Sequence, residues 1–250
     1  MAGHNKWSKI KHKKGAADAK KSKVWTKIIR EITLAVKLSG EDPGCNPRLR
    51  KALDDAKSSN MPKDNITRAI SKGLGGGGND VEELVYEGYA PGGVAIVVEC
   101  MTDNRNRTLS EVRTIIQKKG GSLGAPGSVL FLFKKKGQII FDSESATLPN
   151  EDKILELGLD HGLEDLQNDG EIMSITCAPE NYLTLKDALI NAQINPSNSE
   201  ITMIPDILVK VTADNAKKIF EMIESLEDND DVQNVYSNID FDEKELMEIM

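Results

Sequence analysis

The sequence predicts an α+β protein of three domains, with an α-helical N-terminal domain and two α+β domains, one inserted in the other. Apolar residues recur at helical spacing through residues 24–70. Short apolar runs alternating with amphipathic segments follow from residue 94 onward. A glycine run at residues 75–78 separates the two parts, and the charge changes sign there. These observations place the first domain boundary after residue 78.

The N-terminal domain, residues 1–78, should form a small bundle, because short helices of this kind are stable only when packed on one another. Asn46-Pro47 is a helix start, since Asn caps a helix and Pro fits its first turn. Gly40 and Gly73 are helix stops. We expect helices at residues 24–36, 46–60 and 62–73. The glycine run is a linker, because no strand precedes it and no Gly-Lys-Ser/Thr follows it to cradle a phosphate.

The remainder of the chain reads as two α+β domains. The sequence Thr108-Leu-Ser-Glu111 predicts a capping box that opens a helix ending at Gly120. Strands are expected at 94–98, at 129–133 and 138–141 as a hairpin, and at 172–177, 199–204, 207–211 and 232–239, with helices at 151–161, 183–192 and 216–226. The outer elements fit a β-α-β-β-α-β unit, the ferredoxin-like order. We assign residues 79–142 and 206–250 to this outer domain and 143–205 to the insertion.

Charge is distributed very unevenly along the chain. The first thirty residues hold ten Lys or Arg and one acidic residue, Asp18, although the whole chain has a formal net charge of −8. Residues 1–78 carry 18 basic and 7 acidic side chains, and the remaining 172 residues carry 14 and 33. A segment this polarised indicates a polyanionic partner for the N-terminal part.

The N-terminal arm combines positive charge with side chains that can stack on bases. We expect phosphate contacts and base stacking from Lys6, Trp7, Lys9, Lys11, His12, Lys13, Lys14, Lys20, Lys21 and Lys23. The alternative is a solvated basic tail with no specific partner. A tail that only solubilises does not need Trp7.

Two further segments are candidates for nucleic-acid contact. The turn at residues 59–62 joins two helices as in a helix-turn-helix, and Lys63, Asn65 and Arg68 would lie at the start and outer face of the second helix. An ordinary antiparallel helix pair is the alternative. Arg105 and Arg107 precede a helix and offer forked donors to phosphate, or Asp103 pairs with one of them internally.

Catalytic, metal and membrane functions find little support in the sequence. The three histidines have no metal-ligand spacing and form no nucleophile–base arrangement. The cysteines are too far apart to indicate a disulfide framework or a zinc site. No apolar run is long enough to span a membrane. We therefore expect a protein that is not an enzyme and has no cofactor or metal.

Three motifs in order resemble the YebC/PmpR family over essentially the full length of the chain. They are Ala2-Gly-His-Asn-Lys-Trp-Ser-Lys-Ile-Lys-His-Lys-Lys14, the pair Asn46–Arg50 and Ala56–Ile70, and Tyr86–Ala95 with Thr102–Thr108 and Gly120–Gly124. The resemblance implies the three-domain fold and a cytoplasmic bacterial protein that regulates transcription by binding promoter DNA. Relatives such as the mitochondrial translational activator of cytochrome c oxidase imply a role at the ribosome instead.

Two functions therefore remain open. The first is a DNA-binding transcriptional regulator that uses the basic arm and the helical domain. The second is a ribosome- or ribosomal-RNA-associated translation factor, because an extended basic arm with one Trp suits unstacked RNA bases. The oligomeric state and the target sequence are not indicated by the residues.

Overall fold

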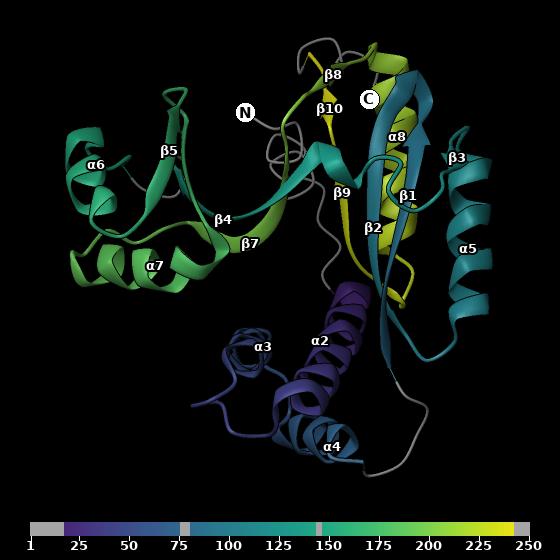
Figure 1. Cartoon of the computed structure of the whole chain (residues 1–250), viewed down its shortest axis with the longest axis horizontal. Coiled ribbons are helices and arrows are strands. Elements are labelled where there is room, and N and C mark those ends of the chain that lie inside the picture. Colours follow the sequence, from purple (N-terminus) through teal and green to yellow (C-terminus); the bar gives the residue numbers. More distant parts are fainter. Residues whose placement is uncertain (1–17, 76–80, 144–146, 243–250) are drawn as a thin grey trace. The chain divides into compact units, whose positions relative to one another are not determined.

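The computed structural model describes residues 18–75, 81–143 and 147–242, with side chains from Lys23 onward. It confirms the α+β class, with helices at the N-terminal end and antiparallel sheets after them (Figure 1). The described residues form two compact units. One spans residues 131–207, and the other joins the chain before residue 131 to the chain after residue 207. One unit is therefore inserted in the other, as expected, but it starts before the predicted boundary at residue 143.

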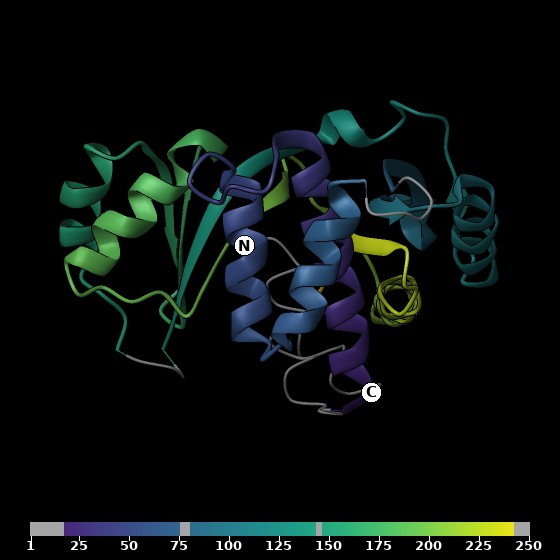
Figure 2. The ribbon, with the colours of Figure 1, turned by 90° about the horizontal axis from the view of Figure 1, so that it is seen from below.

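The three predicted N-terminal helices are present as α2 (Asp18–Ser39), α3 (Pro47–Ser58) and α4 (Lys63–Gly73). Asn46 caps α3 as predicted, because its Oδ1 accepts a hydrogen bond from the Leu49 N–H at 3.0 Å. Figure 2 shows the three helices packed side by side. Their shared core is built from Ile32, Ala35, Val36, Leu49, Ala52, Ala56, Met61 and Ala69.

A four-stranded antiparallel sheet in the order β3-β1-β2-β9 follows in the same compact unit. Its helices, α5 and α8, lie on one side of the sheet and share its apolar core (Figure 1). A small parallel pair, β8 with β10, extends the domain. The bounds are β1 (Glu82–Ala90), a 3-10 turn (Pro91–Gly93), β2 (Val94–Thr102), α5 (Arg105–Lys118), β3 (Ser122–Leu123), β8 (Val209–Lys210), α8 (Ala213–Glu227), β9 (Val232–Ser237) and β10 (Ile239–Asp240).

The inserted unit has the β-α-β-β-α-β order that we assigned to the outer domain. Its antiparallel sheet runs β5-β6-β4-β7. Its core includes Ile139, Ile154, Met173, Ile175 and Leu185. The elements are a 3-10 turn (Leu130–Leu132) leading into it, β4 (Phe133–Asp142), α6 (Glu151–Leu159), β5 (Leu163–Asn168), β6 (Ile172–Cys177), a 3-10 turn (Pro179–Asn181), α7 (Tyr182–Asn191) and β7 (Asn198–Pro205).

The predicted hairpin at 129–133 and 138–141 is wrong, because β4 is one continuous strand between β6 and β7. Gly137, taken as part of the turn, lies in the strand interior. A Cβ there would come within 2.8 Å of both Cys177 Sγ and Tyr182 Cβ, so the glycine permits close packing of strand and helix. The outer sheet instead uses β1 and β3, which we did not predict.

The predicted capping box at Thr108 is also wrong. The α5 helix begins four residues earlier than predicted, and its N-cap is Asn104, whose Oδ1 accepts a hydrogen bond from the Arg107 N–H at 3.1 Å. The Thr108 side chain is buried within the helix and is used in a polar cluster described below.

A buried carboxylate on β1 fixes the loop that leads out of this domain toward β4. Glu87 is 5% exposed, and it accepts hydrogen bonds from the N–H groups of Gly127 at 2.5 Å, Val129 at 2.8 Å and Leu130 at 2.8 Å. Burial alone would raise the pKa of Glu87, but these backbone donors outweigh it and hold the pKa below its ordinary value. These bonds explain why residues 129–132 turn instead of continuing a strand.

We expect Glu87→Gln to loosen this loop, because a neutral amide accepts hydrogen bonds more weakly than a carboxylate and carries donors that face other donors. Amide hydrogen exchange at Gly127, Val129 and Leu130 should become at least about tenfold faster, corresponding to roughly 1.4 kcal/mol of local stability. The exposed neighbour Glu82, changed to Gln, is the control and should leave these amides unaffected. Equal exchange rates in both variants would contradict the anchoring role.

Candidate nucleic-acid interface

The turn between α3 and α4 is held rigidly from within the helical bundle. Met61 is buried, and its N–H donates to the Ala56 carbonyl at 2.9 Å. Asn60 adopts a left-handed conformation, which Asn tolerates better than most residues. From α2, the indole N–H of Trp25 donates to the Ser59 carbonyl at 3.1 Å. The start of α4 is therefore fixed relative to both other helices.

The cations of the α3–α4 pair fall into two groups. One group has partners: Arg48 Nε contacts Glu31 at 2.6 Å, Lys51 contacts Asp55 at 2.9 Å, and Arg50 donates to backbone carbonyls of the preceding loop. The other group has no side-chain hydrogen bond or ion pair with any described residue. It consists of the exposed residues Lys57, Lys63, Arg68 and Lys72, which we call the α4 surface.

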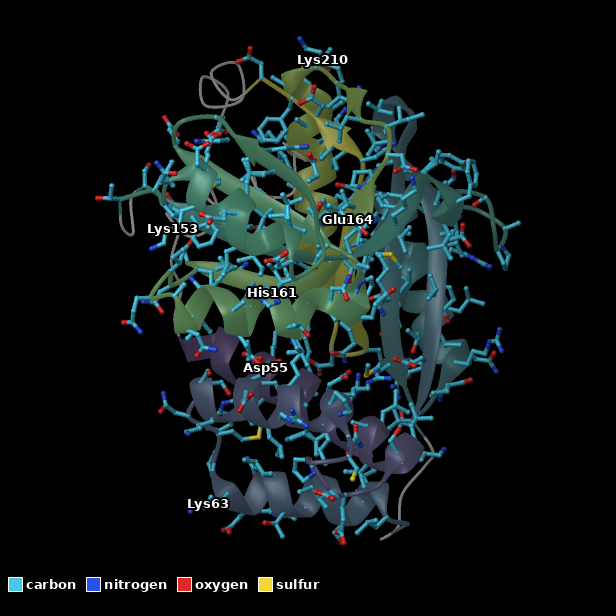
Figure 3. The ribbon with its side chains drawn as sticks, turned by 60° about the vertical axis from the view of Figure 1, so that its left-hand side comes forward. Asp55, Lys63, Lys153, His161, Glu164 and Lys210 are labelled. Carbon is cyan, nitrogen blue, oxygen red and sulfur yellow. The ribbon has the colours of Figure 1, made fainter. Side chains whose placement is uncertain are left out.

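The α4 surface includes two of the residues expected from the sequence. Figure 3 shows Lys63 at the outer edge of the helical bundle. Arg68 and Lys72 are one helical turn apart and so lie on the same face of α4. Asn65 is half-buried beside them. The adjoining face of α4 packs on the bundle: it carries Ala69, which belongs to the bundle core, and Gly73, where a Cβ would lie 2.7 Å from the Thr33 carbonyl of α2.

Most of the predicted arm cannot be placed in this site. Lys6, Trp7, Lys9, Lys11, His12, Lys13 and Lys14 lie outside the described residues, as do the side chains of Lys20 and Lys21. Their role in binding stays a prediction from the sequence.

Lys23 is the last of the predicted arm residues. It lies on a face of α2 that contacts the sheet domain, by which we mean the sheet β3-β1-β2-β9 with α5 and α8. Its Nζ is 2.9 Å from Asp228 Oδ1, in a pair whose side chains are 38% and 72% exposed. One turn further along, Lys27 donates to the Gln233 carbonyl. Arg30 continues this row and pairs with Asp231 at 2.7 Å. This face of α2 therefore holds the helical domain on the sheet domain.

Asp231 is the centre of a buried polar cluster that the sequence did not reveal. It is 2% exposed, and besides Arg30 it binds Arg107 Nη2 at 2.8 Å and the Thr108 hydroxyl at 2.7 Å. The Thr102 hydroxyl donates to the same carboxylate at 3.1 Å. Burial alone would raise the pKa of Asp231. The hydroxyl of Thr108 and the guanidinium groups of Arg107 and Arg30 outweigh burial and lower this pKa below its ordinary value.

The structure favours the alternative in which Arg107 pairs within the protein, and it leaves Arg105 available to bind a ligand. Arg107 is bound by Asp231 and also by Asp103 at 3.1 Å, and the hydrogen bond to Asp231 raises its pKa above the ordinary value. Arg105 is exposed, and its guanidinium pairs with no described residue. The two arginines expected to act together thus have different surroundings.

Metal ligands and reactive thiols were sought among the described residues. No group of three or more His, Cys, Asp or Glu in that part could hold a metal ion. Burial raises the pKa of the Cys100 thiol to about 12 and that of Cys177 to about 11, so neither is a reactive thiolate at neutral pH. No helix among the described residues is long and apolar enough to cross a membrane.

Two family models match the chain, one before and one after the segment that joins α4 to β1. The model described as the TACO1/YebC protein N-terminal domain matches residues 5–76, and the model described as the TACO1/YebC second and third domain matches residues 81–239. The chain belongs to the TACO1/YebC family. The α4 surface therefore lies in the N-terminal domain of this family, and the Asp231 cluster joins Arg30 of that domain to residues of the following part.

Several relatives in the TACO1/YebC family match the whole chain. Proteins from Geotalea uraniireducens, Citrifermentans bemidjiense and Geobacter sulfurreducens are 50%, 51% and 49% identical over 251 residues, covering 100% of each chain, and each is named as a probable transcriptional regulatory protein. The crystal structure of a conserved hypothetical protein from Aquifex aeolicus is 42% identical, with a TM-score of 0.80 over 91% of this chain and 93% of that one. The names of the relatives support a regulator-family role, and the Aquifex aeolicus structure supports the fold.

We expect Asp231→Asn to destabilise the protein by about 3 kcal/mol, because it leaves two arginines facing a neutral group in a buried site. Asp228→Asn is the matched control, and because its pair with Lys23 is exposed it should cost under about 1 kcal/mol. Urea unfolding at pH 7, followed by tryptophan fluorescence, measures both. Equal losses in the two variants would contradict a special role for Asp231.

The stability that Asp231 contributes should depend on pH. Because the folded-state pKa of Asp231 is lowered, its stabilisation is complete above the ordinary Asp value of about 3.9 and is lost as the pH falls through the lower folded-state pKa. The stability difference between the wild type and Asp231→Asn should therefore be constant from pH 5 to 7 and shrink below about pH 4. A difference that stays constant down to pH 2 would contradict this.

Proposed function

We propose that this protein is a nucleic-acid-binding regulator without catalytic activity, and that it contacts phosphate groups through the α4 surface and the basic N-terminal arm. The observation that carries the proposal is the α4 surface itself. Its four exposed cations have no partner among the described residues, although other cations of the same domain do. They lie in the part of the chain where basic side chains outnumber acidic ones by 18 to 7.

We further propose that the physiological ligand is DNA and that the protein regulates transcription. The names of the bacterial relatives support this assignment. The short turn before α4 and the exposed start of that helix suit phosphate contacts that set its register on a duplex. The acidic remainder of the chain would be repelled by DNA and would leave the helical domain facing it.

A ribosome-associated translation factor is the second candidate, and the charge of the inserted unit favours it. Residues 131–207 carry 5 basic and 14 acidic side chains. Such a unit is suited to basic protein surfaces, which ribosomes offer beside their RNA. Co-sedimentation with ribosomes in 150 mM salt supports this candidate, and complete separation from ribosomes at that salt concentration excludes it.

The test of the α4 surface is the salt dependence of binding to a DNA duplex and to a single-stranded RNA. We expect the double variant Lys63→Gln/Arg68→Gln to lower the slope of log K against log salt by about 2 for the duplex, since each lost phosphate contact accounts for about 0.9. Changing Lys9, Lys11, Lys13 and Lys14 to Gln should lower it by about 3 to 4.

The matched control removes two exposed cations of the same domain that already have interactions within the protein, Lys37→Gln/Lys51→Gln. It should leave the slope unchanged. If the α4 and arm variants bind as the control does, the phosphate-contact proposal is wrong. The probe that binds more tightly decides between DNA and RNA.

A further inference from the structure

Helix α5 reverses the sign of charge within an acidic domain. Residues 105–119, the helix and its C-cap, contain five basic side chains and one acidic one. The rest of residues 79–130 and 208–242 contains three basic and fifteen acidic side chains. This is the same kind of local reversal that marks the N-terminal arm, and it occurs in a different domain.

Only part of this charge is neutralised within the protein. Arg107 is bound by Asp231, and Lys119 Nζ contacts Glu221 at 2.9 Å. In contrast, Arg105, Arg113 and Lys118 are exposed and have no side-chain hydrogen bond or ion pair with a described residue. The helix therefore presents three free cations on an otherwise acidic domain.

Helix stability does not account for this pattern. Lys118 lies in the last turn, where a cation is favourable beside the negative end of the helix dipole. Arg105 lies in the first turn, which has no acidic residue, and a cation there is unfavourable by a few tenths of a kcal/mol or more. Arg107 is explained by its bond to Asp231, whereas Arg105 has no such compensation. The presence of Arg105 in the first turn therefore points to a role other than helix stability.

The outward row of α5 is suited to a phosphate backbone. Asn106, Ser110, Arg113 and Gln117 are exposed and recur at spacings of three or four residues, so they share one face of the helix. Their side chains are amides, a hydroxyl and a guanidinium, the groups that donate hydrogen bonds to phosphate oxygens. The inward face carries Val112 and Ile116, which are buried in the domain core. The helix is thus anchored on one side and free to bind on the other.

We propose that the outer face of α5 is a second contact surface for the phosphodiester backbone of the bound nucleic acid. The inference rests on the proposed nucleic-acid function and extends it from the helical domain to the sheet domain. Arg113 in the outward row and Arg105, which is exposed at the first turn of the helix, supply the charge, and Asn106, Ser110 and Gln117 supply neutral hydrogen bonds. DNA and RNA share this backbone chemistry, so both are used as probes.

The test variant is Arg105→Gln/Arg113→Gln in the full-length protein. We expect the slope of log K against log salt to fall by about 2 with a 30-base-pair duplex, or by about 1.4 with single-stranded RNA. Affinity at 0.1 M salt should fall by at least roughly fivefold. The unfolding midpoint should be unchanged or higher, because the variant removes a cation from the first turn of a helix.

The matched control, Lys210→Gln/Lys218→Gln, removes two exposed charges from the same domain outside α5; Figure 3 labels Lys210 on β8. It separates direct contact from a general loss of positive charge. If the test and control variants bind alike, α5 is not a contact surface. If the α4 variant weakens binding and the α5 variant does not, this inference fails and the proposed function stands. If the wild type binds neither probe, both fail.

Discussion

The buried carboxylate of Asp231 is the constraint on which the arrangement of the helical domain and the sheet domain depends. It binds Arg30 of α2, Thr102 at the end of β2, and both Arg107 and Thr108 at the start of α5. A buried charge with several hydrogen-bond donors is costly to leave unpaired, so these elements are stable only when they are together. The α4 surface and α5 are consequently carried by one compact unit.

This arrangement separates cations that hold the fold from cations that are free to bind. Arg30, Arg48 and Arg107 are used within the protein, and their pairing fixes α2, α3 and α5. The other exposed cations of α4 and α5 form no ion pair with a described residue, and they stand on elements that the paired arginines hold in place. Rigid presentation of charge lowers the ordering cost of binding, because fewer side chains and segments must be immobilised when a polyanion arrives.

Features that depend on neighbouring residues, such as helix boundaries, could be predicted from the sequence. Features that depend on contacts between distant residues could not. Helices α2 to α4 were predicted because Asn46, Pro47 and the glycine stops act on neighbouring residues. The continuity of β4 was missed because the place of Gly137 depends on packing against Cys177 and Tyr182, which are distant in the chain. Asp231 was missed for the same reason: in the run Glu227–Asp231 it reads as one of several solvated acids, and its burial arises only when α2, β2 and α5 converge.

Ultraviolet crosslinking in cells would show whether the α4 surface and the N-terminal arm contact nucleic acid. The attached nucleic acid is sequenced and the crosslinked peptides are mapped. We expect crosslinks in residues 1–30 and 57–72. Promoter DNA on these peptides would identify a transcriptional regulator, and ribosomal RNA would identify a translation factor. Recovery of no nucleic acid, or crosslinks confined to the acidic unit at residues 131–207, would contradict the phosphate-contact proposal.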